Sequence, residues 1–130
     1  MVYDSRRSDA RRMYDVDDPD YITGEWVLEQ RELQGNRCYY CDRLMQVERR
    51  TAYDGLQVER LTESLPHLQS ICVLACGDCN RRSHRRLFCP YPVAQARELG
   101  FELDDHHCFR GSPPTSLPSR LSIYQASQQE

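Results

Sequence analysis

The clearest hydrophobic pattern in the first third of the chain lies in the stretch YITGEWVLEQRELQGN, residues 21–36. Its spacing and its end residues predict a helix. The end signals are the N-cap residue Thr23, the hydrophobic staple pair Ile22 and Val27, and the stop residue Gly35. Trp26 has helical spacing within this stretch, which favours a core position over a platform for a ligand.

Three later segments have patterns of their own. RLMQVERRTAYDGLQVERL, residues 43–61, has two alternating stretches around a turn near Asp54 and Gly55, which predicts a β-ribbon. SICVLAC, residues 70–76, is apolar and predicts another strand. The polar run from Cys79 to Arg86 predicts a helix, and PYPVAQARELG, residues 90–100, predicts a second short one.

Both ends of the chain lack such patterns. Residues 1–20 carry mixed charge without apolar periodicity, which predicts an extended or weakly ordered arm with no part in chemistry. Residues 111–130 begin with the Pro/Ser-rich GSPPTSLPS and predict an irregular tail. A chain of 130 residues is too short for two comfortable cores, so we expect one domain over residues 21–110.

Composition limits the location and the class of partner. The chain has no apolar run of the roughly 18 residues that a membrane span needs. The first 20 residues lack the apolar core of a signal peptide and are too rich in Asp for a transit peptide. We therefore expect an intracellular protein, in the cytoplasm, the nucleus or a virus particle, that is not secreted and has no membrane partner.

The basic residues are all arginine. The chain has 17 Lys plus Arg, none of them Lys, and a net charge of −3. A high-GC coding bias explains the arginines, although arginine also binds phosphates well. The overall charge gives no nucleic-acid signal, but four arginines lie close together at positions Arg81, Arg82, Arg85 and Arg86. They are either a solvated helix face or phosphate contacts.

Four of the seven cysteines form two C-x2-C pairs on either side of the predicted ribbon, namely Cys38, Cys41, Cys76 and Cys79. This pattern predicts a structural Zn²⁺ site, because four thiolates fill a tetrahedral coordination shell and leave no open position. Free thiols or a redox pair would not explain two matched pairs. The other three, Cys72, Cys89 and Cys108, are expected to be small buried residues. His106, His107 and Cys108 also have metal-binding side chains but lack a fourth partner.

The segments CYYC, LQVERLTESLPH and CVLACGDCNRRSH, taken in order, resemble the HNH endonucleases in their zinc-bearing, phage- or virus-type form. The resemblance covers about residues 21–88. It implies an α+β fold: a small treble-clef-like zinc domain with an HNH ββα core, an N-terminal helix and irregular tails.

The resemblance also implies roles for individual residues. Glu59 takes the place of the strand metal ligand, and Asn80 takes that of the helix ligand. His84 follows Asn80 by four residues and would share its helix face. Together they would hold Mg²⁺ or Mn²⁺ at a scissile phosphate. The simpler interpretations are an ion pair with arginine for Glu59 and a surface histidine for His84.

The general base of the family is replaced in this chain. Arg60 stands where a histidine is expected, and an arginine does not accept a proton at neutral pH. His67 is the candidate substitute base, with a loop histidine bonded to backbone as its alternative. Arg60 would then contact phosphate, together with the four arginines after Cys79.

The resemblance therefore implies a nucleic-acid-binding protein, with DNA as the first candidate partner. Its active site is degenerate, and its metal-dependent phosphodiester cleavage is weak or lost. The alternative is a non-enzymatic, zinc-stabilised structural or interaction protein, such as a viral component, whose tails bind a protein partner.

Overall fold

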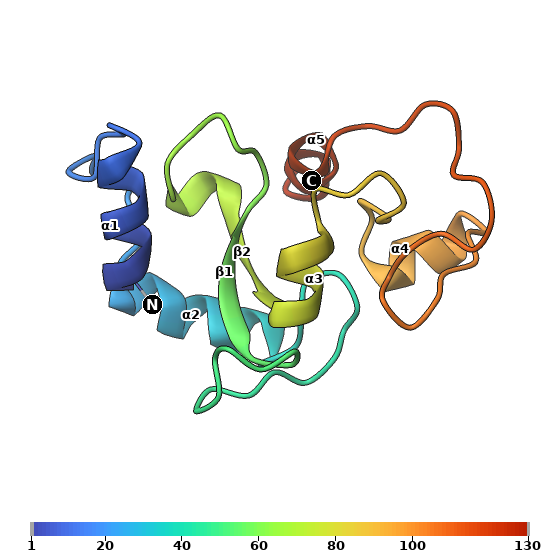
Figure 1. The fold of residues 1–130 in the computed structure, drawn as a ribbon, viewed down its shortest axis with the longest axis horizontal. Helices are drawn as coiled ribbons and strands as arrows, with labels where there is room; N and C mark the ends of the chain where they lie inside the picture. Colours follow the sequence, from blue (N-terminus) through green and yellow to red (C-terminus); the bar gives the residue numbers. More distant parts are fainter. Residues whose placement is uncertain (1, 130) are drawn as a thin grey trace.

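The computed structural model describes residues 2–129 and has an α+β architecture, with short helices around a two-stranded sheet (Figure 1). The elements are α1 (Val2–Arg11), α2 (Gly24–Gln34), β1 (Leu56–Arg60), the 3-10 turn η1 (Gln69–Ile71), β2 (Cys72–Cys76), α3 (Gly77–Arg82), α4 (Val93–Glu98) and α5 (Arg120–Ser127). No helix among these residues is long and apolar enough to cross a membrane.

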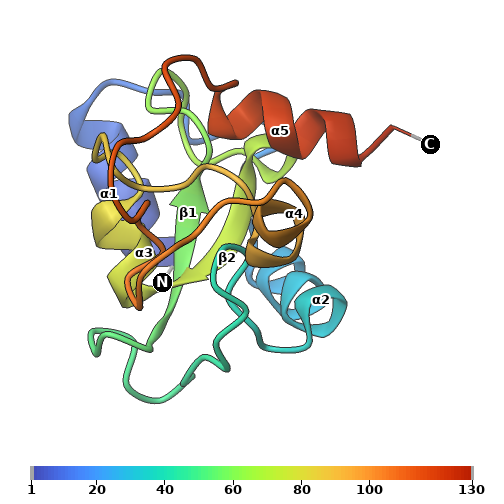
Figure 2. The same ribbon diagram turned by 90° about the vertical axis from the view of Figure 1, so that its right-hand side faces the viewer.

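The sheet is an antiparallel pair at the centre of the fold. Its register runs from Leu56 opposite Cys76 to Arg60 opposite Cys72. Figure 2 shows α1 and α3 on one side of the strands and α2 on the other. All five residues of β2 are buried, as its apolar sequence predicts. The outer edge of β2 is satisfied by Gln34 of α2, which bonds both the N–H and the carbonyl of Leu74.

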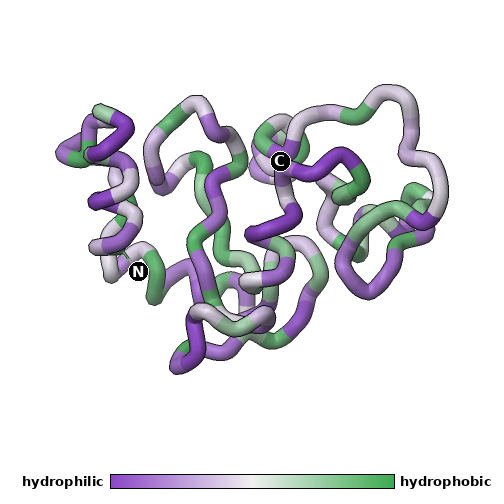
Figure 3. The backbone as a smooth tube through the Cα atoms, viewed as in Figure 1, coloured by the Kyte–Doolittle hydropathy of each residue, from purple (hydrophilic) through white to green (hydrophobic). Residues whose placement is uncertain are grey.

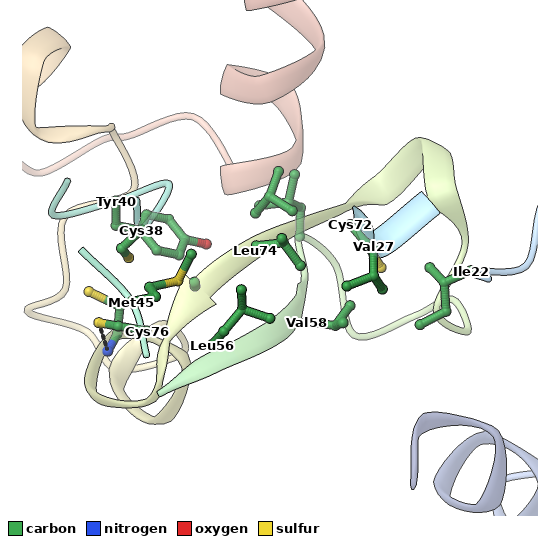
Figure 4. Close-up of a cluster of buried hydrophobic side chains, with 14 of the residues drawn as sticks. Ile22, Val27, Cys38, Tyr40, Met45, Leu56, Val58, Cys72, Leu74 and Cys76 are labelled. Atoms are coloured by element: carbon green, nitrogen blue, oxygen red, sulfur yellow. Dashed lines mark hydrogen bonds between the residues drawn. The ribbon is translucent and has the colours of Figure 1, made fainter. Parts of the chain in front are cut away.

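The core extends along the sheet from the staple of α2 to the cysteine pairs (Figure 4). Leu56, Val58 and Leu74 lie in its middle, and each side chain buried in this way contributes about 1.5–3 kcal/mol. Tyr40 is completely buried at the cysteine end. Because this core reaches the cysteine pairs, the cysteine region and the sheet form one packed unit.

The predicted helix at residues 21–36 is confirmed, including its ends. Thr23 accepts a hydrogen bond from the Trp26 N–H, and Gly35 adopts a left-handed conformation with φ 61°. Ile22 and Val27 are buried as a staple requires, and Trp26 is a core residue. The short helix after residue 90 is also present, as α4.

The predicted ribbon is wrong in its pairing. β1 pairs with β2, and residues 43–50 form only isolated bridges, such as Gln46 with Gly55. The backbone carbonyls of Arg49 and Arg50 pack against Gly55, at a distance that leaves no room for a Cβ. Because Arg49 and Arg50 belong to this tight turn, they do not form the second strand of the predicted ribbon. β2 offers β1 an apolar partner instead.

Both ends of the chain are more ordered than predicted. Residues 2–11 form α1, although much of it is hydrophilic (Figure 3). Residues 120–127 form α5, with Ser119 accepting a hydrogen bond from Ser122 N–H as its N-cap. The predictions of a weakly ordered arm and an irregular tail are therefore wrong at these helices. Long-range contacts, which are absent from local patterns, hold α1 and α5 in place.

Candidate functional site

The four paired cysteines form one compact cluster. The sulfurs of Cys38, Cys41, Cys76 and Cys79 all lie within 4.8 Å of one another. The first pair lies on a tight turn after α2, closed by hydrogen bonds from Cys38 N–H to Arg43 O (2.8 Å) and from Asp42 N–H to Cys38 O (3.0 Å). The second pair spans the end of β2 and the first turn of α3, where Cys76 Sγ accepts from Cys79 N–H at 3.4 Å.

The geometry and charge of this cluster fit a metal ion such as zinc. Four sulfurs in a tetrahedron around Zn²⁺ are about 3.8 Å apart when each Zn–S bond is about 2.3 Å. Cys41 Sγ and Cys76 Sγ are 3.8 Å apart. Hydrogen bonds from Cys38, Cys41 and Cys79 lower the pKa of Cys76, and the Arg43 guanidinium lies 3.6 Å from its sulfur. The pKa of Cys41 is lowered as well, whereas hydrogen bonds among the four thiols raise the pKa values of Cys38 and Cys79. The cluster therefore favours the metal-binding thiolate form at Cys41 and Cys76.

The remaining cysteines lie outside the cluster. Cys72 and Cys89 are completely buried, as expected for small core residues, whereas Cys108 is only partly buried. His106 and His107 have other partners: Nδ1 of His106 lies 3.0 Å from Asp78, and Nε2 of His107 lies 2.7 Å from a backbone carbonyl. Across residues 2–129, no second group of three or more His, Cys, Asp or Glu side chains gathers as metal ligands.

A polar cavity of about 270 Å³ lies between β1, α3 and the two terminal helices. It brings together the residues that the resemblance singled out, namely Glu59, Arg60, His67, Asn80 and His84. Arg12, from the segment after α1, and Arg120 of α5 also line it. Residues that are far apart in the sequence thus share one small space.

Glu59 is buried and paired in this cavity. Its Oε2 atom accepts a hydrogen bond from the Tyr40 hydroxyl (2.9 Å) and one from the Arg120 guanidinium (2.8 Å). Arg120 also donates to the backbone carbonyl of Arg60 at 3.1 Å. Burial raises the pKa of Glu59, although Arg120 opposes the shift. The interpretation of Glu59 as an arginine-paired carboxylate is therefore confirmed, with a partner from the C-terminal helix.

His67 is bonded to Asp9 of α1. Its Nδ1 lies 2.7 Å from Asp9 Oδ2, which also accepts from the His67 backbone N–H at 2.9 Å and the Tyr21 hydroxyl at 2.6 Å. Burial lowers the pKa of His67, while Asp9 opposes that shift. Burial would raise the pKa of Asp9, but the hydrogen bonds from Tyr21 and His67 outweigh it and lower the pKa. The native pair is thus a neutral imidazole beside a carboxylate.

Asn80 and His84 lie on the α3 side of the cavity. Asn80 donates through Nδ2 to Gln57 Oε1 at 2.6 Å. His84 is exposed and follows the end of α3 at Arg82, so the predicted helix through Arg86 is too long. A turn, with a hydrogen bond from Arg85 N–H to Arg82 O, replaces the last part of that helix. The shared helix face predicted for Asn80 and His84 is therefore absent.

Arg60 is held inside the protein. Its Nη1 donates to Leu65 O at 2.9 Å and lies 4.0 Å from Asp9 Oδ1. Its side chain is only 12% exposed. Arg60 therefore adds positive charge to the cavity wall rather than projecting from the surface.

A divalent cation does not fit this arrangement. Glu59 would have to supply a carboxylate oxygen, yet its Oε2 is bonded to Tyr40 and to the positive charge of Arg120. Mg²⁺ and Mn²⁺ prefer several oxygen ligands. Asn80 and His84 alone provide one amide oxygen and one imidazole nitrogen. The positive charge next to Glu59 is therefore the guanidinium of Arg120, not a metal ion.

The arginines after Cys79 divide into two kinds. Arg82 bonds to Asp78 at 2.8 Å, one turn earlier in α3. The side chains of Arg81, Arg85 and Arg86 are exposed, and within residues 2–129 they form no ion pair. Three of the four arginines therefore carry a charge that no carboxylate within residues 2–129 neutralises.

Three residues that bond to Glu59 or His67 have no signal in the sequence pattern: Asp9, Tyr40 and Arg120. Asp9 and Arg120 lie in segments without hydrophobic periodicity, so no local signal indicates that they are inside. Tyr40 lies between Cys38 and Cys41, where its position indicates proximity to the cysteine cluster but not the bond to Glu59. Comparisons of the chain with protein-family models, with curated proteins and with solved structures give no match. The resemblance to HNH endonucleases stays a prediction.

Proposed function

We propose that this chain is a zinc-stabilised, HNH-like nucleic-acid-binding protein with weak phosphodiester cleavage. The observation that supports the proposal best is the shared cavity. It is lined by Glu59, Arg60, His67, Asn80 and His84. In the sequence, these residues stand at positions that resemble a nuclease motif. Their convergence on one space of about 270 Å³ supports a shared phosphodiester site, although not the divalent-ion site of the motif.

The arrangement of the metal cluster adds to this support. A cysteine turn, an antiparallel strand pair and a helix that begins at the second cysteine pair follow one another along the chain. This order resembles a treble clef around structural Zn²⁺. The cluster fixes the start of α3, and α3 carries Asn80 to the cavity and the exposed Arg81 to the surface.

Nucleic-acid binding would use the exposed arginines. Arg81, Arg85 and Arg86 form a local positive surface on a chain whose net charge is −3. Guanidinium groups bind phosphate oxygens in two-point contacts. Arg12 and Arg60 extend positive charge into the cavity, so a phosphodiester that follows the surface arginines would meet His67 there.

Cleavage would be weak for a structural reason. The Glu59 carboxylate that a nuclease would use for a divalent ion is bonded to Arg120. Without such an ion, the reaction loses the charge stabilisation that a bound metal gives to the transition state. The same ion pair favours the second candidate function, a scaffold that binds nucleic acid or protein without catalysis.

A plasmid-nicking assay separates the two candidates. The wild type is compared with His67→Ala and Glu59→Ala, each with and without Mg²⁺ or Mn²⁺, after zinc content and circular dichroism are matched. We expect slow nicking that His67→Ala abolishes. Wild-type nicking no faster than that of His67→Ala would overturn the cleavage and leave the scaffold function.

A further inference from the structure

His67 is held by a residue from the far end of the chain. Asp9 is completely buried. Its Oδ2 atom accepts hydrogen bonds from the Tyr21 hydroxyl and from the His67 backbone N–H, and it lies 2.7 Å from His67 Nδ1. The two contacts to His67 restrain both its backbone and its ring. Such a double contact fixes the orientation of an imidazole more tightly than a side-chain contact alone.

The chemistry of this contact determines which nitrogen carries the proton. A carboxylate only accepts hydrogen bonds, so the neutral ring of His67 must donate from Nδ1. Nε2 then carries the lone pair. Within residues 2–129, no hydrogen bond involves His67 Nε2, whereas the His67 side chain lines the cavity. A proton acceptor is therefore available in the same space as Asn80 and His84.

We propose that Asp9 is a positioning residue, which holds His67 so that Nε2 serves as the proton acceptor of the cavity. This inference rests on the cleavage proposed above. In that reaction Nε2 takes a proton from water as the water oxygen bonds to phosphorus. The bond from phosphorus to the ester oxygen breaks, and that oxygen leaves with the electron pair and takes a proton from solvent.

The charges around His67 suit this role. Asp9 faces the ring from α1, Arg12 from the segment that follows α1, and Arg60 from β1, while Tyr21 bonds to Asp9. The two arginines oppose a positive charge on the ring and attract a phosphodiester. Asp9 Oδ1 has no hydrogen-bond partner, and the Arg60 guanidinium lies 4.0 Å away, so Arg60 balances the carboxylate without competing for Oδ2.

Nitrogen-15 NMR of the His67 ring in the zinc-loaded full chain tests the positioning directly. In free histidine the proton prefers Nε2, so a protonated Nδ1 is diagnostic of the contact with Asp9. We expect the wild type to show the Nδ1–H tautomer. In Asp9→Asn the carboxylate charge is lost, so we expect a mixture of tautomers and a lower His67 pKa. Asp17→Asn, which makes the same charge change at a side chain that is 87% exposed, should retain the wild-type spectrum.

Nicking by the same proteins tests the catalytic consequence. We expect Asp9→Asn to cut about 10²-fold more slowly, within the range for a displaced general base, and Asp17→Asn to cut at the wild-type rate. An Nε2–H tautomer in the wild type overturns the positioning, as does wild-type nicking by a folded Asp9→Asn. If the wild type shows the Nδ1–H tautomer but cuts nothing, the proposed cleavage is overturned, whereas the holding of His67 by Asp9 is supported.

Discussion

The cysteine cluster is assembled from two short sequence clips, whereas the adjoining cavity is assembled from both ends of the chain. Each C-x2-C pair brings two sulfurs together through a local turn. The cavity instead depends on Asp9 from α1 and Arg120 from α5, which contact residues 58 and 61 positions away. The difference teaches that local turns are enough to form the cysteine cluster. The contacts made by the cavity residues depend on the two terminal helices.

Two buried carboxylates show the same point in their pKa values: Glu59 lines the cavity, and Asp9 bonds to the cavity residue His67. The pKa of Asp9 is lowered, because hydrogen bonds from Tyr21 and His67 outweigh its burial. The pKa of Glu59 is raised, because burial outweighs the contacts with Arg120 and Tyr40. Asp9 is thus a carboxylate that supports a neutral histidine, whereas Glu59 is held by an arginine and is withdrawn from metal binding.

Removal of the zinc ion proposed for the cysteine cluster should have the largest effect on the molecule. Structural zinc contributes on the order of 10 kcal/mol of apparent binding free energy, which exceeds the net stability of most small domains. We expect Cys79→Ser to lose zinc and unfold at 25 °C, as measured by far-UV circular dichroism and zinc analysis. Cys108→Ser, which removes a thiol outside the cluster, should fold normally. A folded Cys79→Ser protein without metal would contradict this part of the account.

The ion pair between Arg120 and Glu59 should have the next largest effect. Removing one partner of a buried pair leaves an uncompensated charge and costs about 3–5 kcal/mol. We expect Arg120→Ala to lose about 3 kcal/mol in urea unfolding at pH 7, at the low end because its side chain is 14% exposed.

The matched control is the double variant Glu59→Gln/Arg120→Ala. It removes the stranded charge, so it should be more stable than Arg120→Ala alone. If the two substitutions instead destabilise additively, the contact between α5 and the cavity does not operate as an ion pair in solution.

The sequence predicts the parts of this molecule that depend on near neighbours. The α2 helix follows from Thr23 and Gly35, and the cysteine cluster follows from the spacing of its pairs. The partners of Glu59 and His67 do not follow from the sequence, since Asp9 and Arg120 lie in polar segments whose order comes from these contacts themselves. A short polar helix has little stability of its own, so propensity does not indicate it.

Acid should destabilise the fold through the buried ring of His67. The pKa of His67 is lower in the folded protein than its ordinary value of 6.5, because burial disfavours the charged ring. The unfolded chain therefore binds more protons, and this stability is present above pH 6.5 and lost as the pH falls through the folded pKa.

One such group changes the free energy of unfolding by at most about 1.4 kcal/mol per pH unit. In urea unfolding at pH 7.5 and 5.5, we expect the loss of stability to be smaller in His67→Gln than in the wild type. Thiolate protonation affects the two proteins alike. An equal loss in the two would show that His67 is not held as a neutral ring.

The central claim is the proposal that the exposed arginines of α3 and the turn after it bind nucleic acid. The salt dependence of binding tests it most directly. Fluorescence anisotropy with duplex DNA gives the slope of log affinity against log salt, which is about 0.9 per neutralised phosphate. We expect Arg81→Ala/Arg85→Ala to reduce the slope by up to about 2 units. The control Arg97→Ala/Arg110→Ala, with the same charge change at exposed sites elsewhere, should leave it unchanged. Equal slopes in the wild type and the Arg81→Ala/Arg85→Ala variant, or no binding at low salt, would contradict the claim.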